Sequence, residues 1–268
     1  MAGEARYGTV LWRGRPCAGV FEEESVKLLG EGSLKQFLQE NALEEAFPTA
    51  EARYEEVSFL PPIPDPQKII CVGLNYRDHA DELRRKKLLT SLPKEPVIFL
   101  KPPSSLIGHK QEIIWPREAA RVDYEGEVAV VVGKRCRGVR ATDASSYILG
   151  YSCFNDVTAR DLQKRDVQWT RAKSFDTFSP FGPWIATGVD ASGLRIQTLL
   201  NGRVVQDSNT ENMIFPISKL IEFISGVMTL EPGDVIATGT PAGVGPMKKG
   251  DIVKVKAWGV GELENPIT

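Results

Sequence analysis

Three carboxylates occupy alternate positions where a polar segment enters an apolar one, in DYEGEVAVVVG at residues 123–133. The apolar part, Val128 to Val132, is short, β-branched and bounded by glycine, which predicts a fully buried strand. Because strand side chains alternate between faces, Glu125 and Glu127 are expected to point the same way, and Asp123 is a candidate to join them. Each unpaired buried ion costs roughly several kcal/mol. The pattern therefore predicts a compensating cation, basic partners or open water at this strand end.

A further acid follows a second apolar strand. In FNDVTARD, residues 154–161, Asp156 comes directly after an apolar stretch and before a polar segment with helical character. Two glutamates from one strand and an aspartate from another would supply three oxygen ligands, which suit hard cations such as Mg²⁺ or Mn²⁺. Spacing alone leaves an alternative, in which the acids form ion pairs with Arg121 or Arg160.

A third candidate is DHADE, residues 78–82, within a charge-rich segment from Asn75 to Glu95. His79 and Glu82 are three residues apart and share a face if the segment is helical. A carboxylate that holds an imidazole fixes its tautomer and raises its basicity, as a general base requires. The segment is accordingly interpreted either as a mobile lid over a site or as a solvated helix and loop.

The elements that must position these residues are mostly short strands. Strands are predicted at residues 6–20 (two, around a turn), 68–73, 95–102, 112–114, 126–132, 147–154, 183–187, 195–205, 234–238 and 252–257. Helices are predicted from Ser33 to Phe47, with Ser33 and Gln36 as a capping box, and from Pro216 to Met228. Few helices, 24 glycines and 18 prolines favour an α+β, mainly β fold.

A proline-rich connector, PPIPDP at residues 61–66, suggests a domain boundary near residue 60. The expected division is a small N-terminal α+β appendage at residues 1–60 and a catalytic domain at 61–268. The appendage contains no recognisable active residues, and we expect it to support packing or dimerisation.

The composition is that of an ordinary soluble globular protein, with 42% hydrophobic and 25% charged residues. A net charge of −2 provides no global basic field, so we expect no nucleic-acid partner. No apolar run approaches the roughly 18 residues of a membrane span, and no secretory pattern is visible at the start, so no membrane association is expected. Four scattered cysteines without a CxxC pair indicate a reducing, cytoplasmic compartment.

An ordered series of motifs covers about three-quarters of the chain: CVGLNYRDHADE (71–82), EPVIFLKP (95–102), DYEGEVAVVVG (123–133), NDVTARDLQ (155–163), QWTRAKSFDTFSPFGPWI (168–185), NGRVVQDSNTENMIF (201–215) and MTLEPGDVIATGTPAGVG (228–245). In order and spacing these motifs resemble the fumarylacetoacetate hydrolase family at its C-terminal catalytic domain. The resemblance implies a distorted β-sandwich roll and a homodimer.

The resemblance also assigns residues. It implies that Glu125, Glu127 and Asp156 hold a divalent cation, Mg²⁺ or Mn²⁺, which Ca²⁺ can replace in crystals. Three residues map to catalytic positions: His79, Glu82 and Lys173. Four map to positions near the substrate, with a structural role as the alternative: Arg160, Gln163, Gly239 and Thr240.

The implied substrate is a small 2-oxo or 2,4-dioxo acid whose enolate is stabilised by the cation. Cleavage of the C3–C4 bond, as an acylpyruvate-type hydrolase or an oxaloacetate-type decarboxylase, is favoured by the intact pair of His79 and Glu82. The alternatives are a tautomerase or isomerase of oxaloacetate or 2-hydroxyhepta-2,4-diene-1,7-dioate type, and a non-catalytic scaffold that binds Ca²⁺ structurally. The basic run at residues 84–87 could steer a dianionic substrate, or be a solvated lid surface.

Overall fold

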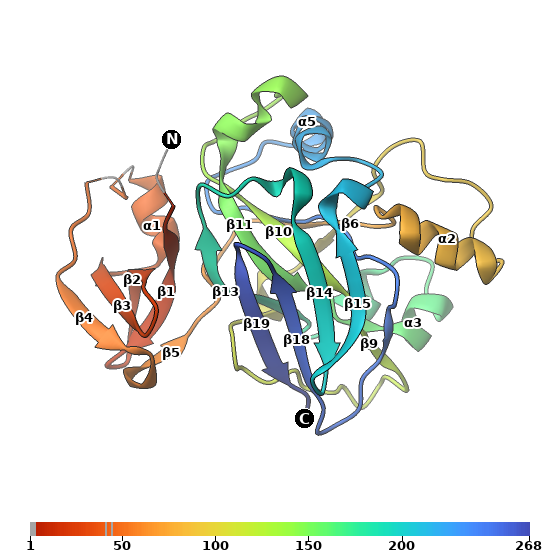
Figure 1. The fold of residues 1–268 in the computed structure, drawn as a ribbon, viewed down its shortest axis with the longest axis horizontal. Helices are drawn as coiled ribbons and strands as arrows, with labels where there is room; N and C mark the ends of the chain where they lie inside the picture. The colour runs from red at the N-terminus through yellow and green to blue at the C-terminus, as the bar shows by residue number, and fades with distance from the viewer. Residues whose placement is uncertain (1–3, 41, 44) are drawn as a thin grey trace.

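The computed structural model describes residues 4–40, 42–43 and 45–268, and its largest feature is a twelve-stranded mixed sheet (Figure 1). Its strands are β1 (Arg6–Trp12), β2 (Arg15–Phe21), β3 (Ser25–Glu31), β4 (Ala50–Arg53), β5 (Val57–Phe59), β6 (Ile69–Val72), β7 (Ile98–Lys101), β8 (Leu106–Ile107), β10 (Gly126–Val132), β11 (Ile148–Asn155), β13 (Ser179–Ala186) and β16 (Val235–Ala237). The order across the sheet is β4-β3-β2-β1-β13-β11-β10-β16-β6-β7, with β5 on β1 and β8 on β13. Most pairs are antiparallel, whereas β6–β16 and β8–β13 are parallel.

Two smaller sheets complete the β structure of the described residues. Four strands, β14 (Arg195–Leu200), β15 (Arg203–Asn209), β18 (Ile252–Ala257) and β19 (Gly261–Pro266), form one sheet, and β9 (Val122–Tyr124), β12 (Thr158–Ala159) and β17 (Gly245–Pro246) form the other. Val128 and Cys153 of the large sheet pack against Ile196, Val255 and Leu263 of the four-stranded sheet. This apolar layer between two sheets makes the sandwich.

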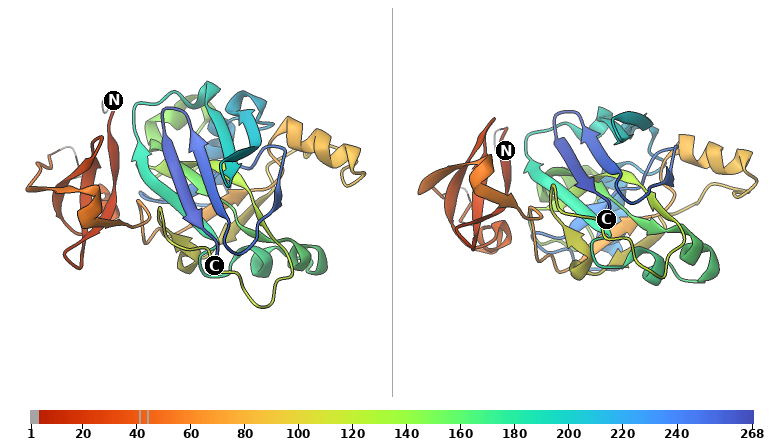
Figure 2. Two further views of the ribbon diagram at one scale, coloured as in Figure 1. Left: turned by 60° about the horizontal axis from the view of Figure 1, so that its bottom comes forward. Right: turned by 90° about the horizontal axis from the view of Figure 1, so that it is seen from below.

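In the described part of the chain, five α-helices lie around the sheets: α1 (Leu34–Gln39), α2 (Arg77–Arg85), α3 (Arg160–Arg165), α4 (Thr170–Lys173) and α5 (Ile217–Val227). Short 3-10 helices lie at Tyr54–Glu56, Pro103–Ser105, Ala141–Tyr147, Ala191–Gly193 and Thr210–Asn212. The apolar stripe of α5 packs on Ile70, Val130 and Ile236 of the large sheet. By contrast, α2 lies at the end of the molecule opposite the N-terminal lobe (Figure 2). It buries only Ala80, which agrees with its charged sequence.

The N-terminal lobe, formed by β1–β5 and α1, is set off from the remaining structure in all views (Figures 1 and 2). It is nevertheless joined to the large sheet, because Arg6 and Tyr7 of β1 pair with Ala186 and Ile185 of β13. The boundary near residue 60 stays a prediction. No helix in the described part of the chain is both long and apolar enough to cross a membrane.

The α+β, mainly β fold expected from the sequence is confirmed. The helix at Pro216–Met228 is also confirmed, as is the capping box of Ser33 and Gln36.

Three local predictions were wrong. The first helix ends at Gln39 and does not continue to Phe47, whose side chain is exposed; residues 41 and 44 of that prediction lie outside the described residues. The predicted strand 195–205 is a hairpin of β14 and β15, turned at Asn201 and Gly202, both at positive φ. Residues 112–114 make only an isolated bridge, from Ile113 to Ile267.

Candidate metal centre and active site

The antiparallel pairing of β10 with β11 brings the acidic residues together. Gly126 faces Asn155 across the ladder, and the backbone N–H of Asp156 donates to the carbonyl of Glu125 at 2.8 Å. The start of one strand therefore meets the end of the other. One carboxylate oxygen from each of Glu125, Glu127 and Asp156 lies within 4.8 Å of the others, and all three residues are buried.

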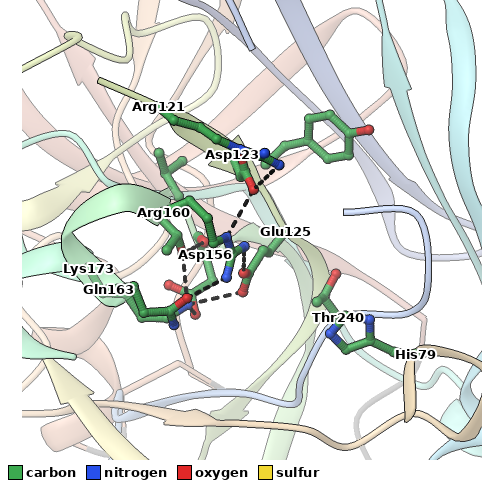
Figure 3. Close-up of polar contacts among 12 residues, drawn as sticks. His79, Arg121, Asp123, Glu125, Asp156, Arg160, Gln163, Lys173 and Thr240 are labelled. Carbon is green, nitrogen blue, oxygen red and sulfur yellow. Dashed lines mark hydrogen bonds and ion pairs between the residues drawn. The ribbon is translucent and has the colours of Figure 1, made fainter. Parts of the chain in front are cut away.

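Asp123, the fourth acid of this region, has basic partners instead. Arg121 donates two hydrogen bonds to its carboxylate, at 2.7 and 3.0 Å, and Arg160 donates a third at 2.9 Å. Arg160 also contacts Glu125 and donates to Gln163 at 2.5 Å (Figure 3). The ion pairs considered as the alternative to a metal site are thus present, but they engage Asp123 and one end of Glu125.

Two buried lysines complete the charge cluster. Lys173, at the end of α4, donates to Glu125 at 3.0 Å, to Asp156 at 2.5 Å and to the hydroxyl of Thr158 at 2.8 Å. Lys101, at the end of β7, donates to the other oxygen of Asp156 at 2.6 Å and to the carbonyl of Phe178 at 2.7 Å. Lys101 lies in the motif EPVIFLKP, but no role was predicted for it from the sequence. A lysine directly after an apolar strand was the sequence signal that could have identified it.

The electrostatics differ sharply between the two glutamates. Burial alone would raise the pKa of Glu125, but Lys173 and Arg160 lower it to about 2. Burial, together with the negative charges of Asp156 and Glu125, holds the pKa of Glu127 well above its ordinary value. Glu127 therefore has less positive charge around it than Glu125 and Asp156 have.

The three carboxylates suit a hard divalent cation. Their donor atoms are all oxygens, gathered from two strands whose backbones are fixed by the ladder. Glu127 accepts one hydrogen bond, from the N–H of Gly239 at 2.7 Å, and its Oε1 atom accepts none from the described residues. A cation among the three carboxylates would offset the repulsion between their negative charges that Lys101 and Lys173 do not compensate.

The pair predicted as a water-activating dyad lies on α2. His79 Nδ1 is 3.2 Å from Glu82 Oε2, and both side chains are mostly buried. Glu82 also accepts from the N–H of Gly243 at 3.1 Å and from Lys86 at 2.6 Å. Figure 3 shows His79 beside Thr240, to one side of the acidic cluster. The contact with Gly243 thus holds α2 over the edge of the site where Thr240 lies. The catalytic role of His79 and Glu82 stays a prediction.

The residues predicted near the substrate have well-defined protein contacts. Besides the ion pairs of Arg160, the Thr240 hydroxyl donates to the carbonyl of Gly126 at 2.9 Å and accepts from Gln206 at 2.8 Å. Gly239 presents its N–H to Glu127, as described above. These contacts show how Gly239 and Thr240 support the site. Substrate binding by any of the four residues predicted near the substrate remains a prediction.

Gly239→Ala is expected to destabilise the protein by roughly 1–3 kcal/mol and to weaken metal binding. The residue has a φ of +99°, and an added Cβ would lie 2.8 Å from the Cβ of Asn75. Relieving this contact would shift the backbone at Gly239 and would move the N–H that donates to Glu127. The matched control is Gly250→Ala, with a φ of +89° but no atom within 4 Å of the added Cβ. Thermal melts with and without Mg²⁺ would check this, and equal effects of both variants would contradict it.

Comparison with known proteins places this arrangement in context. Residues 68–268 match the family model described as fumarylacetoacetate (FAA) hydrolase C-terminal. An uncharacterised protein of Archaeoglobus fulgidus is 59% identical over 209 residues, which is 78% of this chain and 81% of that protein. The mitochondrial oxaloacetate tautomerase Fahd2a of Rattus norvegicus is 43% identical over 223 residues, covering 79% of this chain and 70% of the relative. The crystal structure of 2-hydroxyhepta-2,4-diene-1,7-dioate isomerase from Mycobacterium marinum aligns with a TM-score of 0.86 and 39% identity, over 98% of each chain.

The fold and the site together define a β-sandwich protein with a buried, metal-compatible acidic triad. The chain belongs to the fumarylacetoacetate hydrolase family, which confirms the resemblance seen in its sequence motifs.

Proposed function

We propose that this protein is a divalent-metal-dependent enzyme that interconverts tautomers or double-bond isomers of a 2-oxo dicarboxylic acid through an enolate. The observation that carries the proposal is the buried triad of Glu125, Glu127 and Asp156, with oxygens within 4.8 Å. Relatives named as an oxaloacetate tautomerase and a 2-hydroxyhepta-2,4-diene-1,7-dioate isomerase support this choice of reaction.

In this proposal the triad holds Mg²⁺ or Mn²⁺, which supplies Lewis-acid stabilisation of negative charge on the substrate's oxygens. The ammonium of Lys173 adds positive charge at the same place. Burial works against that charge, but Asp156 and Glu125 raise the pKa of Lys173, so it remains protonated. Lys101 and Arg160 hold Asp156 and Glu125 in place. The imidazole of His79, oriented by Glu82, takes a proton from the substrate carbon or returns it.

The second candidate is cleavage of the C3–C4 bond of a 2-oxo or 2,4-dioxo acid, by hydrolysis or decarboxylation. It is favoured by the hydrogen-bonded pair of His79 and Glu82, because a carboxylate-oriented imidazole can deprotonate water. Loss of CO₂ from a substrate such as oxaloacetate would not require that water.

A homodimer and a cytoplasmic location are proposed as well.

The two reactions can be separated by incubating the protein and Mg²⁺ with oxaloacetate, acetylpyruvate and fumarylpyruvate. We expect the absorbance change of enol–keto relaxation of oxaloacetate to accelerate while no pyruvate is released. Pyruvate formation at a comparable rate would instead select the cleavage reaction. Absence of both activities, combined with tight Ca²⁺ binding, would favour the structural scaffold.

His79→Ala tests the dyad. If His79 moves the proton, the rate of the chemical step should fall by about 10²–10⁴ with little change in Mg²⁺ affinity. The control is Asp81→Ala on the same helix, since Asp81 is exposed and pairs only with Arg84 among the described residues. Initial rates and calorimetric metal titrations would be compared. A rate within twofold of the unmodified protein would remove His79 from the mechanism.

A further inference from the structure

Gln206 is a buried residue of β15 whose side chain links the two sheets of the sandwich beside the acidic triad. It belongs to the four-stranded sheet, whereas the strand of the two glutamates belongs to the large sheet. Only 2% of the residue is exposed, and its amide makes three hydrogen bonds. One partner is a backbone N–H and another is a backbone carbonyl, so the oxygen and the nitrogen of the amide cannot be exchanged. The side chain is therefore held in one orientation and can fix the groups that it contacts.

The oxygen of this amide binds the peptide between the two glutamates of the triad. Gln206 Oε1 accepts from the backbone N–H of Gly126 at 3.0 Å. Gly126 has no side chain, and an added Cβ would lie 2.0 Å from Thr198 Oγ1 and 3.3 Å from Gln206 Oε1. The glycine between Glu125 and Glu127 therefore allows the four-stranded sheet to approach the backbone that carries both carboxylates.

The nitrogen of the same amide binds the turn that follows β16. Nε2 donates to Thr240 Oγ1 at 2.8 Å and to the carbonyl of Pro241 at 2.9 Å. The hydroxyl of Thr240 donates in turn to the carbonyl of Gly126 at 2.9 Å, which closes a ring of hydrogen bonds between the strand and the turn. The next residue of the turn, Gly239, donates its N–H to Glu127 at 2.7 Å. The amide thus contacts both segments that place the Glu127 carboxylate.

We propose that Gln206 is a positioning residue of the metal site. It sets the distance between the Gly126 peptide and the 239–241 turn, and thereby the position of the Glu127 carboxylate. This inference rests on the proposed function, because it assigns the triad to Mg²⁺ or Mn²⁺. Glu127 depends on the turn because its one hydrogen bond from the described residues comes from Gly239. Groups that orient a metal ligand in this way typically contribute about 10–100-fold to metal affinity.

Gln206→Met is the direct test, because it keeps the approximate size of the side chain and removes all three hydrogen bonds. The matched control is Asn265→Leu on β19. Asn265 is 1% exposed, and its amide donates to the carbonyls of Gly108 and Gln111, both at 2.8 Å. That segment supplies no residue to the triad. Mg²⁺ and Mn²⁺ alone are titrated calorimetrically into each folded protein, and the melting temperatures of the metal-free proteins are measured alongside.

We expect both variants to melt at a lower temperature than the unmodified protein, because each leaves buried backbone groups without a partner. Only Gln206→Met should weaken the binding of Mg²⁺ and Mn²⁺, by about 10–100-fold. Unchanged metal affinity in Gln206→Met, or an equal loss in Asn265→Leu, would overturn the inference and leave the proposed function intact. If the unmodified protein binds neither ion, the proposed function fails together with the inference.

Thr240→Val tests the same ring from the side of the turn, and it decides the question if Gln206→Met does not fold. It removes the hydroxyl that accepts from Gln206 and donates to Gly126, so metal binding should weaken by about tenfold or more. Because the titrant is the metal alone, a contact of Thr240 with substrate does not enter the result. If both single variants fold, the double variant should lose less binding free energy than the sum of the two, since both break one ring. Unchanged affinity in Thr240→Val, or additive losses, would contradict the inference.

Discussion

Glu127→Gln is expected to abolish divalent-cation binding and enzymatic activity together. The substitution keeps the size of the side chain but removes the negative charge of the triad member that has no ion-pair partner among the described residues. In the free protein the variant should be as stable as the original or more stable, because an uncharged amide replaces a buried carboxyl whose ionisation is opposed by burial and by the charges of Asp156 and Glu125. On adding Mg²⁺ or Mn²⁺ at one hundred times the dissociation constant, the original protein should gain about 2.7 kcal/mol of stability and the variant nothing.

A variant that is stable without metal but gains no stability from added metal has lost a metal ligand. A variant whose fold is damaged would be less stable without metal as well. Calorimetric titration would give the affinity, and thermal melts would give the stabilisation. Glu118→Gln is the control, since it makes the same chemical change at the surface, where Glu118 pairs with the exposed Arg117. A Glu127→Gln protein that binds metal with unchanged affinity and remains active would refute the assignment of the triad.

Lys101→Met should produce the largest loss of stability among the substitutions considered, about 3–5 kcal/mol. The side chain of Lys101 is completely buried, and its ammonium contacts Asp156 and the carbonyl of Phe178. Removing it leaves a buried carboxylate short of one counter-charge and a carbonyl short of one donor. Denaturant unfolding at neutral pH would measure the effect.

The control for Lys101→Met is Lys27→Met, because Lys27 forms an exposed ion pair with Glu22 at 2.7 Å, and exposed ion pairs contribute little to stability. If Lys101→Met does not fold, the double variant with Asp156→Asn should recover part of the stability, since the stranded charge is then removed as well. Equal losses in the buried and the exposed variant, or a double variant that is worse than the sum of its parts, would contradict the role given to Lys101.

The local features of the site were predictable because they depend on near neighbours in the chain. A short β-branched run bounded by glycine identified the 126–132 strand, and the period of two in a strand put Glu125 and Glu127 on one side of it. The end of an apolar stretch identified Asp156, and a spacing of three identified His79 with Glu82. The ordered motifs identified the family. Apart from the family, which the motifs along the chain identified together, each of these features needs only the residues within one or two elements.

Partner choice between distant segments was not predictable in this way. Spacing could not tell whether the acids meet a metal or arginines. The structure has Arg121 and Arg160 on Asp123, whereas no described residue donates to the Oε1 atom of Glu127. The long helix expected from Ser33 to Phe47 failed for a related reason, because helices are stabilised mainly by what they pack against.

The sequence by itself determined the mainly β fold class and the family, and it singled out the acidic residues and the pair of His79 and Glu82 as candidates. Only the tertiary structure decided which cations neutralise which acids, and that Lys101 holds Asp156 across 55 residues of chain. The physical reason is that side-chain direction within a strand is a local property. Contacts between strands depend instead on sheet order and register, which the packing of the whole chain fixes.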